Sequence, residues 1–388
     1  MMRRRDVLGA LVASGVMIRG FPVAAAPTGR VIVSKLALVA GRVVMGLTID
    51  GAGPYLFMID TGGHLSMIDE ALARSLKLAP QGMTRASGVG GVATLPVFLA
   101  HNVVFGGGAV QPYVAFAGME HGFAGAVRGA LAAGMVTAVE SDLDFEKGEW
   151  RAYPDGRPER VGFTRLADAI VGGDRPESGS PRLYGEAEVD GHRFRFVLDT
   201  GAPGGVSLGM AAARKLGLWD DARPYAPQQP RGIGGVGGLG RLVRARSLTF
   251  GGRTIERPLV LLRARSDRPG GDDDGILGLE VLKHFNLSTE PRTRSLWVKP
   301  YGDFAPEERY GMSGLWLDPT RDGARVAAVG TGSPAAAAGV LVGDRLVGEP
   351  FADLVRKISG RPGAAVTLNL ARNGAAPRAV TFTLTPYL

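Results

Sequence analysis

Two copies of the triplet Asp-Thr-Gly stand out among the residues that could do chemistry. They begin at Asp60 and Asp199, and each directly follows an apolar run, at residues 55–59 and 194–198. Two equivalent carboxyl groups at the ends of two strands can work as one unit if the fold brings them together. Carboxyl groups about 3 Å apart cannot both ionise, so they share a proton. The ionised group can then polarise a water molecule, while the protonated group donates its proton to a carbonyl oxygen.

The segments that follow the two triplets are also alike. Residues 63–78 and 202–218 each begin with a glycine-containing turn and continue with apolar residues at helical spacing. We therefore expect each aspartate to end a strand and to be followed by a turn and a short amphipathic helix. One triplet alone would be weak evidence, because Asp and Gly are common in turns.

The similarity between the two halves extends beyond the triplets, as an internal duplication would produce. Asp60 and Asp199 are 139 residues apart, and the later glycines Gly90 and Gly234 are 144 residues apart. Further landmarks recur in the same order at nearly the same spacing. They are the glycine clusters at 87–92 and 231–236, the segments 102–106 and 247–251, the segments 129–132 and 275–278, and Trp150 with Trp297.

These features resemble a retropepsin-type aspartic protease with both lobes fused in one chain, over roughly residues 31 to 300. The resemblance implies two pseudo-symmetric β lobes, a cleft between them, and a peptide or protein substrate. It assigns catalysis to Asp60 and Asp199 at the base of the cleft. The threonine hydroxyls would tie the two loops together, and the glycines would allow close backbone approach because they lack a Cβ. These supporting residues are Thr61, Gly62, Thr200 and Gly201.

The resemblance also implies two glycine-rich hairpins, or flaps, that close over a substrate and exclude water. Their glycines are Gly88, Gly90 and Gly91 in the first half and Gly232, Gly234 and Gly235 in the second. The first half departs from the family pattern. It has Ala132 where the second half has Gly278, and Gly63 where Ala or Ser is more usual. Both Asp-Thr-Gly triplets are nevertheless intact, so we expect activity.

The N-terminus reads as an export signal over residues 1–26. Arg3, Arg4 and Arg5 precede a short apolar stretch, and small residues follow at 23–26. The arginine pair resembles a twin-arginine signal, and a plain secretory signal or a membrane anchor are the alternatives. The chain has no Cys, which excludes disulfides, lipoprotein attachment and Cys-based metal sites. We expect a location in a bacterial periplasm or cell envelope.

The last segment, residues 305–388, is not part of the duplication and resembles a bacterial PDZ domain. The resemblance rests on Ser-Pro-Ala-Ala-Ala-Ala-Gly at 333–339 and on Gly343-Asp344. It implies that a peptide strand and its terminal carboxylate bind at Gly314, Leu315, Trp316 and Leu317. The usual segment after Gly-Asp is shortened here, and the alternative is a structural β module packed against the rest of the chain.

Charge and the remaining motifs point to no other chemistry. The net charge is +8, with arginines crowded at 241–268, which suits a solvated surface or attraction to acidic substrates or an anionic membrane. No interleaved aromatics accompany them, so we expect no nucleic-acid binding. Residues 232–237 fit a dinucleotide glycine motif only superficially, and Asp272 to Asp274 read as an acidic loop. We expect no metal and no organic cofactor.

Together these observations predict a mainly β protein of four parts. They are the signal at 1–26, lobe 1 at 27–155, lobe 2 at 156–304 and an α/β PDZ-like domain at 305–388. The expected function is that of an exported aspartic endopeptidase, with the PDZ-like domain helping to select peptides. The alternative is a protein that binds peptides or an envelope component in the same cleft without cutting them. Because both aspartates lie in one chain, we expect a monomer.

Overall fold

The computed structural model describes residues 29–173, 179–264, 273–304, 309–372 and 376–388, and the fold is mainly β, as predicted. The expected export signal at 1–26 lies outside the described residues, as do Asp272 and part of the arginine-rich segment. In the part of the chain that the structure describes, no helix is both long enough and apolar enough to cross a membrane.

Lobe 1 is built on an eight-stranded sheet with the order β2-β3-β4-β9-β5-β8-β7-β6, and an additional pairing of β3 with β7 folds this sheet back on itself. Every second residue of β3 from Val43 to Ile49 is buried, so one face of the strand lies in the core. The strands are β2 (Ala37–Val39), β3 (Arg42–Ile49), β4 (Ala52–Asp60), β5 (Met67–Asp69), β6 (Ala79–Gly88), β7 (Gly91–Phe105), β8 (Ala109–Met119) and β9 (Val127–Ala132).

Lobe 2 repeats this plan on a ten-stranded sheet. Its order is β17-β20-β23-β16-β24-β15-β14-β21-β22, and β13 pairs with β14. Phe194, Phe196 and Leu198 are buried on one face of β15, and Val197 is buried on the other. The strands are β13 (Ile170–Val171), β14 (Arg182–Val189), β15 (His192–Asp199), β16 (Val206–Leu208), β17 (Ala226–Gln228), β20 (Gly240–Arg244), β21 (Ser247–Phe250), β22 (Arg253–Glu256), β23 (Leu259–Leu262) and β24 (Gly275–Gly278).

Each lobe contains the predicted strand, turn and helix after its triplet. Strand β4 ends at Asp60 and β15 ends at Asp199, and the helices are α2 (Glu70–Ser75) and α4 (Met210–Lys215). In each lobe the aspartate strand pairs in parallel with a later strand, β4 with β9 and β15 with β24. This equivalence of local structure and pairing is what a duplication predicts.

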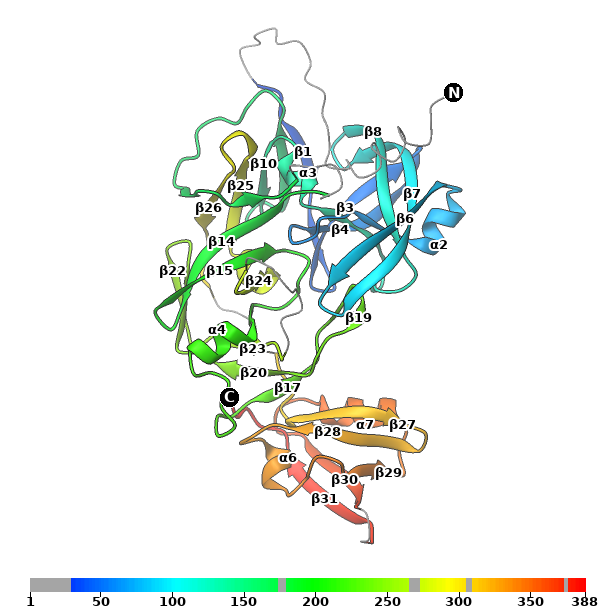
Figure 1. Ribbon diagram of the computed structural model, residues 1–388, viewed down its shortest axis with the longest axis vertical. Helices are drawn as coiled ribbons and strands as arrows, with labels where there is room; N and C mark the ends of the chain where they lie inside the picture. The colour runs from blue at the N-terminus through cyan, green and yellow to red at the C-terminus, as the bar shows by residue number, and fades with distance from the viewer. Residues whose placement is uncertain (1–28, 174–178, 265–272, 305–308, 373–375) are drawn as a thin grey trace.

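A third sheet joins the two lobes, and the sequence analysis did not anticipate it. Its order is β1-β11-β10-β25-β26-β12, so β10 of the first half pairs with β25 of the second. Figure 1 shows this sheet bridging the lobes at one end of the molecule. The lobes therefore have a fixed relative position. The strands are β1 (Ile32–Lys35), β10 (Glu140–Asp144), β11 (Glu149–Tyr153), β12 (Thr164–Leu166), β25 (Phe285–Glu290) and β26 (Ser295–Pro300), accompanied by α3 (Gly134–Thr137), α5 (Leu279–Leu282) and the 3-10 turn η2 (Pro291–Thr293).

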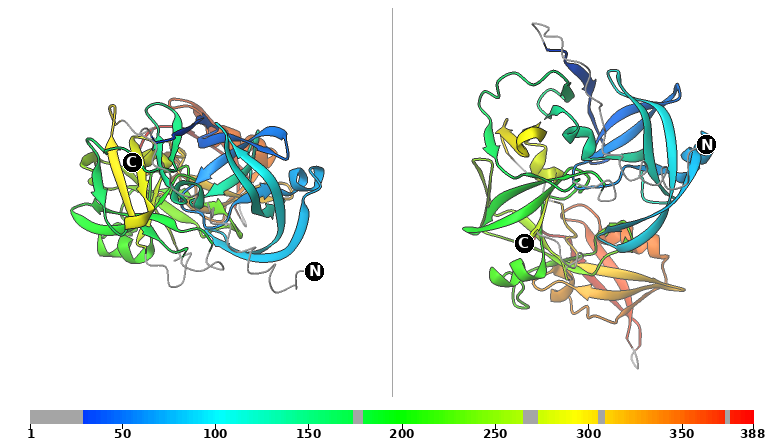
Figure 2. Two further views of the ribbon diagram at one scale, coloured as in Figure 1. Left: turned by 90° about the horizontal axis from the view of Figure 1, so that it is seen from above. Right: turned by 45° about the horizontal axis from the view of Figure 1, so that its top comes forward.

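The C-terminal unit has a separate hydrophobic core and a five-stranded sheet with the order β27-β28-β29-β30-β31. It lies at the end of the molecule opposite the shared sheet (Figures 1 and 2). Its elements are β27 (Leu315–Thr320), β28 (Gly323–Val329), α6 (Pro334–Ala337), β29 (Arg345–Val347), α7 (Phe351–Ile358), β30 (Ala365–Ala371) and β31 (Arg378–Thr383).

Tyr225 of lobe 2 connects the C-terminal unit to the rest of the chain. Its hydroxyl donates to the Val329 carbonyl at 3.0 Å, and its own carbonyl accepts from the Tyr387 hydroxyl at 3.0 Å. The guanidinium of Arg241 lies 4.6 Å from the Tyr225 ring centre and 4.6 Å from that of Trp219. Tyr225 is therefore held on both sides, by Arg241 of lobe 2 and by the C-terminal unit.

Candidate active site

The two predicted aspartates meet where the lobes face each other. Asp60 and Asp199 end their strands, and their side chains are hydrogen-bonded to each other. The glycines that follow make this approach possible. A Cβ on Gly62 would lie 2.4 Å from Cγ of Asp199, and a Cβ on Gly201 would lie 2.7 Å from Cγ of Asp60. Any larger residue at either position would push the carboxyl groups apart.

The two threonines of the triplets hold the loops together through a symmetrical set of hydrogen bonds. The Thr61 hydroxyl donates to the Leu198 carbonyl at 2.6 Å and accepts from the Thr200 N–H at 3.0 Å. The Thr200 hydroxyl donates to the Ile59 carbonyl at 2.6 Å and accepts from the Thr61 N–H at 3.2 Å. Both threonines are 0% exposed, so water cannot replace these bonds. Each loop is thus fixed to the strand end of the opposite lobe.

The protonation of the two carboxyl groups follows from their surroundings. Burial raises the pKa of Asp60 to about 8, with the charge of Asp199 and the hydrogen bond between the two side chains acting in the same direction. The N–H groups of Gly63 and Gly62 oppose this rise only in part. The Asp199 carboxylate accepts hydrogen bonds from the N–H groups of Gly201 at 2.8 Å and Ala202 at 3.0 Å. Asp60 therefore holds its proton to a higher pH than an exposed aspartate does, as expected for two carboxyl groups that share a proton.

Two glycine-containing hairpins, one from each lobe, meet each other. The first is the turn between β6 and β7, which holds Gly88, Gly90 and Gly91. The second is the small hairpin of β18 (Arg231–Gly232) and β19 (Gly235–Val236). The Gly90 N–H donates to the Ile233 carbonyl at 3.0 Å. A Cβ on Gly90 would lie 2.3 Å from the carbonyl carbon of Gly235. The two hairpin tips are therefore in backbone contact.

The remaining hairpin glycines are also close to this contact. A Cβ on Gly88 would lie 2.8 Å from Cβ of Ile233, and one on Gly232 would lie 3.5 Å from Cβ of Val89. Gly234 has a φ of +83° and would place a Cβ 2.4 Å from the carbonyl carbon of Gly91. The structure thus brings together all six predicted hairpin glycines, although they come from opposite halves of the sequence.

An apolar cluster lies beneath the hairpins on the lobe 1 side, and sequence reasoning missed it. Its buried members are Met67, Ala117 and Ala130, and Met58 and Ile233 pack against them. Met58 lies two residues before Asp60 on β4, and Ile233 is the tip of the second hairpin. The cluster's residues come from several strands and from both lobes, so no short motif could have revealed it.

The predicted peptide site in the C-terminal unit lies on β27 and the turn before it. Gly314 has a φ of +75°, and its N–H donates to the Gly311 carbonyl at 3.0 Å. The Leu315 N–H donates to the Ser313 hydroxyl at 3.2 Å. Two of the N–H groups expected to face a carboxylate are therefore bonded within the turn. Trp316 and Leu317 lie on β27, which is an edge strand in the order of its sheet.

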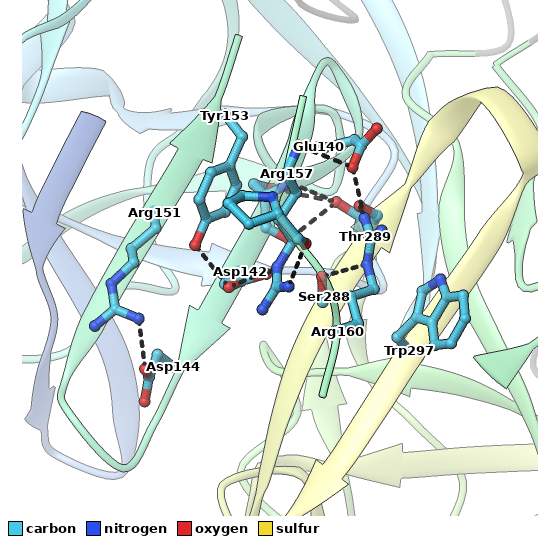
Figure 3. Close-up of polar contacts among 12 residues, drawn as sticks. Glu140, Asp142, Asp144, Arg151, Tyr153, Arg157, Arg160, Ser288, Thr289 and Trp297 are labelled. Carbon is cyan, nitrogen blue, oxygen red and sulfur yellow. Dashed lines mark hydrogen bonds and ion pairs between the residues drawn. The ribbon is translucent and has the colours of Figure 1, made fainter. Parts of the chain in front are cut away.

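A second polar cluster, also unanticipated, lies on the shared sheet (Figure 3). Arg157 Nε lies 2.7 Å from Asp142 Oδ1, with the two side chains 10% and 4% exposed. Tyr153 donates to the same carboxylate at 2.9 Å, and Arg160 pairs with Glu140 at 2.7 Å. Asp142 and Arg157 also help to line a hollow of about 220 Å³. The cluster fastens the segment after β11 onto the sheet that joins the lobes.

Among the residues that the structure describes, no three acidic, His or Cys side chains are grouped as metal ligands would be. His64 lies in the loop after Asp60, and its carbonyl accepts from the Ser180 N–H at 2.9 Å across the lobes. Asp274 accepts from the Arg195 N–H at 2.9 Å, which makes part of the expected acidic loop a structural contact.

Comparison with known proteins points to one family. The sequence model of a family described as "Aspartyl protease" matches residues 45–136 and 185–281, one segment in each lobe, and each contains one triplet. No curated protein matches the chain. Solved structures that it resembles include an aspartic proteinase from Irpex lacteus, at 12% identity over 70% of this chain and 97% of that one, with a TM-score of 0.43. Another is a retropepsin-like aspartic protease from Rickettsia conorii, at 18% identity over 35% and 90%, with a TM-score of 0.27. The family match confirms the resemblance to aspartic proteases in both halves and supports a peptidase.

Proposed function

We propose that the protein is an exported aspartic endopeptidase in which Asp60 and Asp199 activate one water molecule. The observation that carries this proposal is the buried, hydrogen-bonded carboxyl pair, in which burial and the neighbouring Asp199 raise the pKa of Asp60 to about 8. General acid–base catalysis of amide hydrolysis needs a protonated and an ionised group at once, within reach of one substrate carbonyl. A pair of carboxyl groups that share a proton supplies them.

The proposed reaction uses each carboxyl group in a different role. The Asp199 carboxylate takes a proton from water as the water oxygen adds to the peptide carbonyl carbon. Asp60 gives its proton to the carbonyl oxygen, which forms a neutral tetrahedral diol. The diol then collapses as a hydroxyl proton returns to Asp60 and the proton on Asp199 passes to the leaving nitrogen. The carbon–nitrogen bond breaks, and the pair is left with one proton, as before.

The surroundings of the pair support this chemistry. The threonine bonds between the loops hold the carboxyl groups in position before the substrate arrives, which reduces reorganisation during reaction. The hairpins would open to admit an extended peptide and close over it, so that water is excluded. Since both carboxyl groups belong to one chain, a monomer contains the whole site.

The proposal includes a location and an accessory role. Export to the periplasm or envelope rests on the basic and apolar N-terminal sequence at 1–26. Recognition of a peptide C-terminus by a PDZ-like domain at 305–388 rests on its glycine motifs and on the edge position of β27. An edge strand presents unpaired backbone groups to which a peptide strand can add.

A second candidate is a protein that binds peptides in the same cleft without cutting them. The observation that favours it is the asymmetry of the two lobes. Asp199 pairs across its ladder with Gly278, whereas Asp60 pairs with Ala132, so lobe 1 lacks the equivalent glycine. The extra methyl group is buried near the carboxyl pair.

One experiment distinguishes the two candidates. The mature chain, starting near Pro27, is incubated with a diverse peptide pool between pH 3 and pH 8, and the products are read by mass spectrometry. An endopeptidase cleaves internal bonds, and cleavage disappears in the Asp60→Asn variant. Peptide binding without products at any pH would instead identify the binding protein.

A further inference from the structure

Arg42 is a charged residue beside the carboxyl pair that the mechanism above does not use. It is the first residue of β3, which pairs with β4 in antiparallel register. Val44 lies opposite Met58 in this ladder. Arg42 lies two residues beyond this pair on β3, on the same face as Val44, and Asp60 lies two residues beyond it on β4, on the same face as Met58. The charges of Asp199 and Asp60 both act on the Arg42 guanidinium, so the carboxyl pair is close to it.

The face that carries Arg42 is the one that faces the hairpins. Side chains two residues apart on a strand lie on the same face, so Met58 and Asp60 share it. Met58 packs against the apolar cluster that includes Ile233, the tip of the second hairpin. Arg42 therefore lies on the cleft side of lobe 1, next to the position where a bound peptide would pass.

The charge of Arg42 is poorly compensated in this position. Nη1 of its guanidinium is buried and has no hydrogen-bond partner among the described residues. Burial lowers the pKa of Arg42, and the carboxyl groups of Asp199 and Asp60 oppose this without reversing it. Because those two groups share a proton, they provide only one negative charge, which the N–H groups of their own loops also stabilise. An arginine keeps its charge at any physiological pH.

A buried cationic donor without an acceptor is costly, and a ligand that provides the acceptor removes the cost. The best acceptor for a guanidinium is a carboxylate, which takes short, charge-assisted hydrogen bonds. We infer that Arg42 is a specificity-determining residue that binds a carboxylate of the substrate. The favoured substrates are then peptides with an acidic residue close to the bond that is cut. This inference rests on the proposed function for its cleavage readout, but not for its binding readout.

The carboxylate could be an Asp or Glu side chain, or the free C-terminus of a short peptide. A peptide series separates these sources. The series starts from one peptide of the diverse pool that the wild type cleaves. At each position around the cleaved bond in turn, one variant peptide carries Glu and a matched one carries Gln. A parallel pair ends near that bond with a free acid or an amide. Loss of a charge-assisted hydrogen bond corresponds to about a 10- to 100-fold loss in kcat/KM.

The decisive quantity is the ratio of kcat/KM for the Glu peptide to that for the matched Gln peptide. We expect a ratio of about 10 to 100 at one position in the wild type, falling to about 1 in Arg42→Gln. The Arg42→Glu variant should prefer Lys at that position. The matched control is Arg193→Gln, since Arg193 is a 67% exposed arginine on lobe 2. Thermal melting and circular dichroism verify that each variant is folded.

Each outcome decides the inference. The inference is overturned if the Glu-to-Gln ratio of kcat/KM is the same in the wild type and in Arg42→Gln. It is also overturned if Arg42→Gln lowers kcat/KM for both peptides by the same factor, because Arg42 would then act only through the carboxyl pair. A preference for the free-acid peptide alone would assign Arg42 to the substrate's C-terminus.

The same peptides are also titrated against the Asp199→Asn protein, with and without Arg42→Gln, by fluorescence anisotropy. If the wild type cuts nothing but Arg42 still selects Glu over Gln in binding, the endopeptidase proposal fails and this inference stands. If cleavage is seen without any Arg42-dependent preference in either assay, the inference fails and the endopeptidase stands.

Discussion

Replacing Thr200 by valine tests how strongly the two loops depend on each other. Valine keeps the shape of threonine but removes the hydroxyl that donates to Ile59 at 2.6 Å and accepts from Thr61 at 3.2 Å. One carbonyl and one N–H then remain buried without these partners. Each buried group left unsatisfied costs about 1 to 3 kcal/mol, so we expect a loss of about 2 to 6 kcal/mol in the free energy of unfolding.

The assay is urea unfolding of the mature chain, followed by tryptophan fluorescence, which reports on Trp150, Trp219 and Trp297 in the two-lobe body and on Trp316 in the C-terminal unit. Thr200→Ser is the control, because it keeps the hydroxyl and removes one methyl group, at a cost of about 1 kcal/mol. We expect Thr200→Val to be the less stable of the two variants and to cleave peptides much more slowly. Equal stability of the valine and serine variants would refute the argument that these bonds hold the loops together.

Three further predictions follow from the same geometry. Gly62→Ala should lower kcat/KM by about 100-fold, because the new Cβ would lie 2.4 Å from Cγ of Asp199 and displace that carboxyl group. Gly204→Ala is the control and should leave kcat/KM near the wild-type value, because its Cβ would meet nothing within 4 Å. The pKa of Asp60 is raised from 3.8 to about 8, so the folded chain binds this proton more tightly than the unfolded chain. The Asp60 proton therefore contributes its full stability below about pH 4, and this contribution is lost as the pH rises through about 8. The melting temperature should fall over this pH range in the wild type and fall less in Asp60→Asn. Arg157→Gln should destabilise the two-lobe body by about 3 kcal/mol in urea unfolding, because the buried Asp142 carboxylate loses its cationic partner and keeps only the Tyr153 hydrogen bond. A change below about 0.5 kcal/mol would contradict that.

The parts of the fold that were predictable from sequence are those encoded locally. The apolar runs before Asp60 and Asp199 define two strands, and the Thr-Gly pair that follows each aspartate forms a turn. The amphipathic pattern after the turn gives α2 and α4. Because each pattern occurs twice in one order, the duplication could be recognised without knowledge of the three-dimensional structure.

The contacts that were missed join residues far apart in the chain. Strand β10 pairs with β25, from Ser141 against Thr289 to Leu143 against Leu287. Nothing in either strand specifies the other, since any half-buried strand with free edges offers the same backbone groups. The shared sheet therefore became visible only in the structure, together with the ion pairs of Arg157 and Arg160 that cover it.

In the candidate site, too, the residues in local motifs were predictable and those placed by long-range pairing were not. The aspartates, threonines and hairpin glycines belong to short motifs, and the structure brings them together as the motifs suggested. Arg42 belongs to no motif, and its importance comes from the register of β3 against β4 and from the burial of Nη1. At Gly314 the motif was misleading in its detail. It predicted free N–H groups, but those of Gly314 and Leu315 already donate hydrogen bonds within the turn.

The most direct test of the central claim is a double-mutant cycle on the carboxyl pair. Asp60→Asn, Asp199→Asn and the double variant are compared for kcat/KM on one peptide that the wild type cleaves, after each is verified as folded. If the two carboxyl groups act as one unit, each single variant loses several orders of magnitude and the double variant loses no more than the singles. Cleavage retained in either single variant, or losses that multiply in the double, would contradict a shared-proton mechanism.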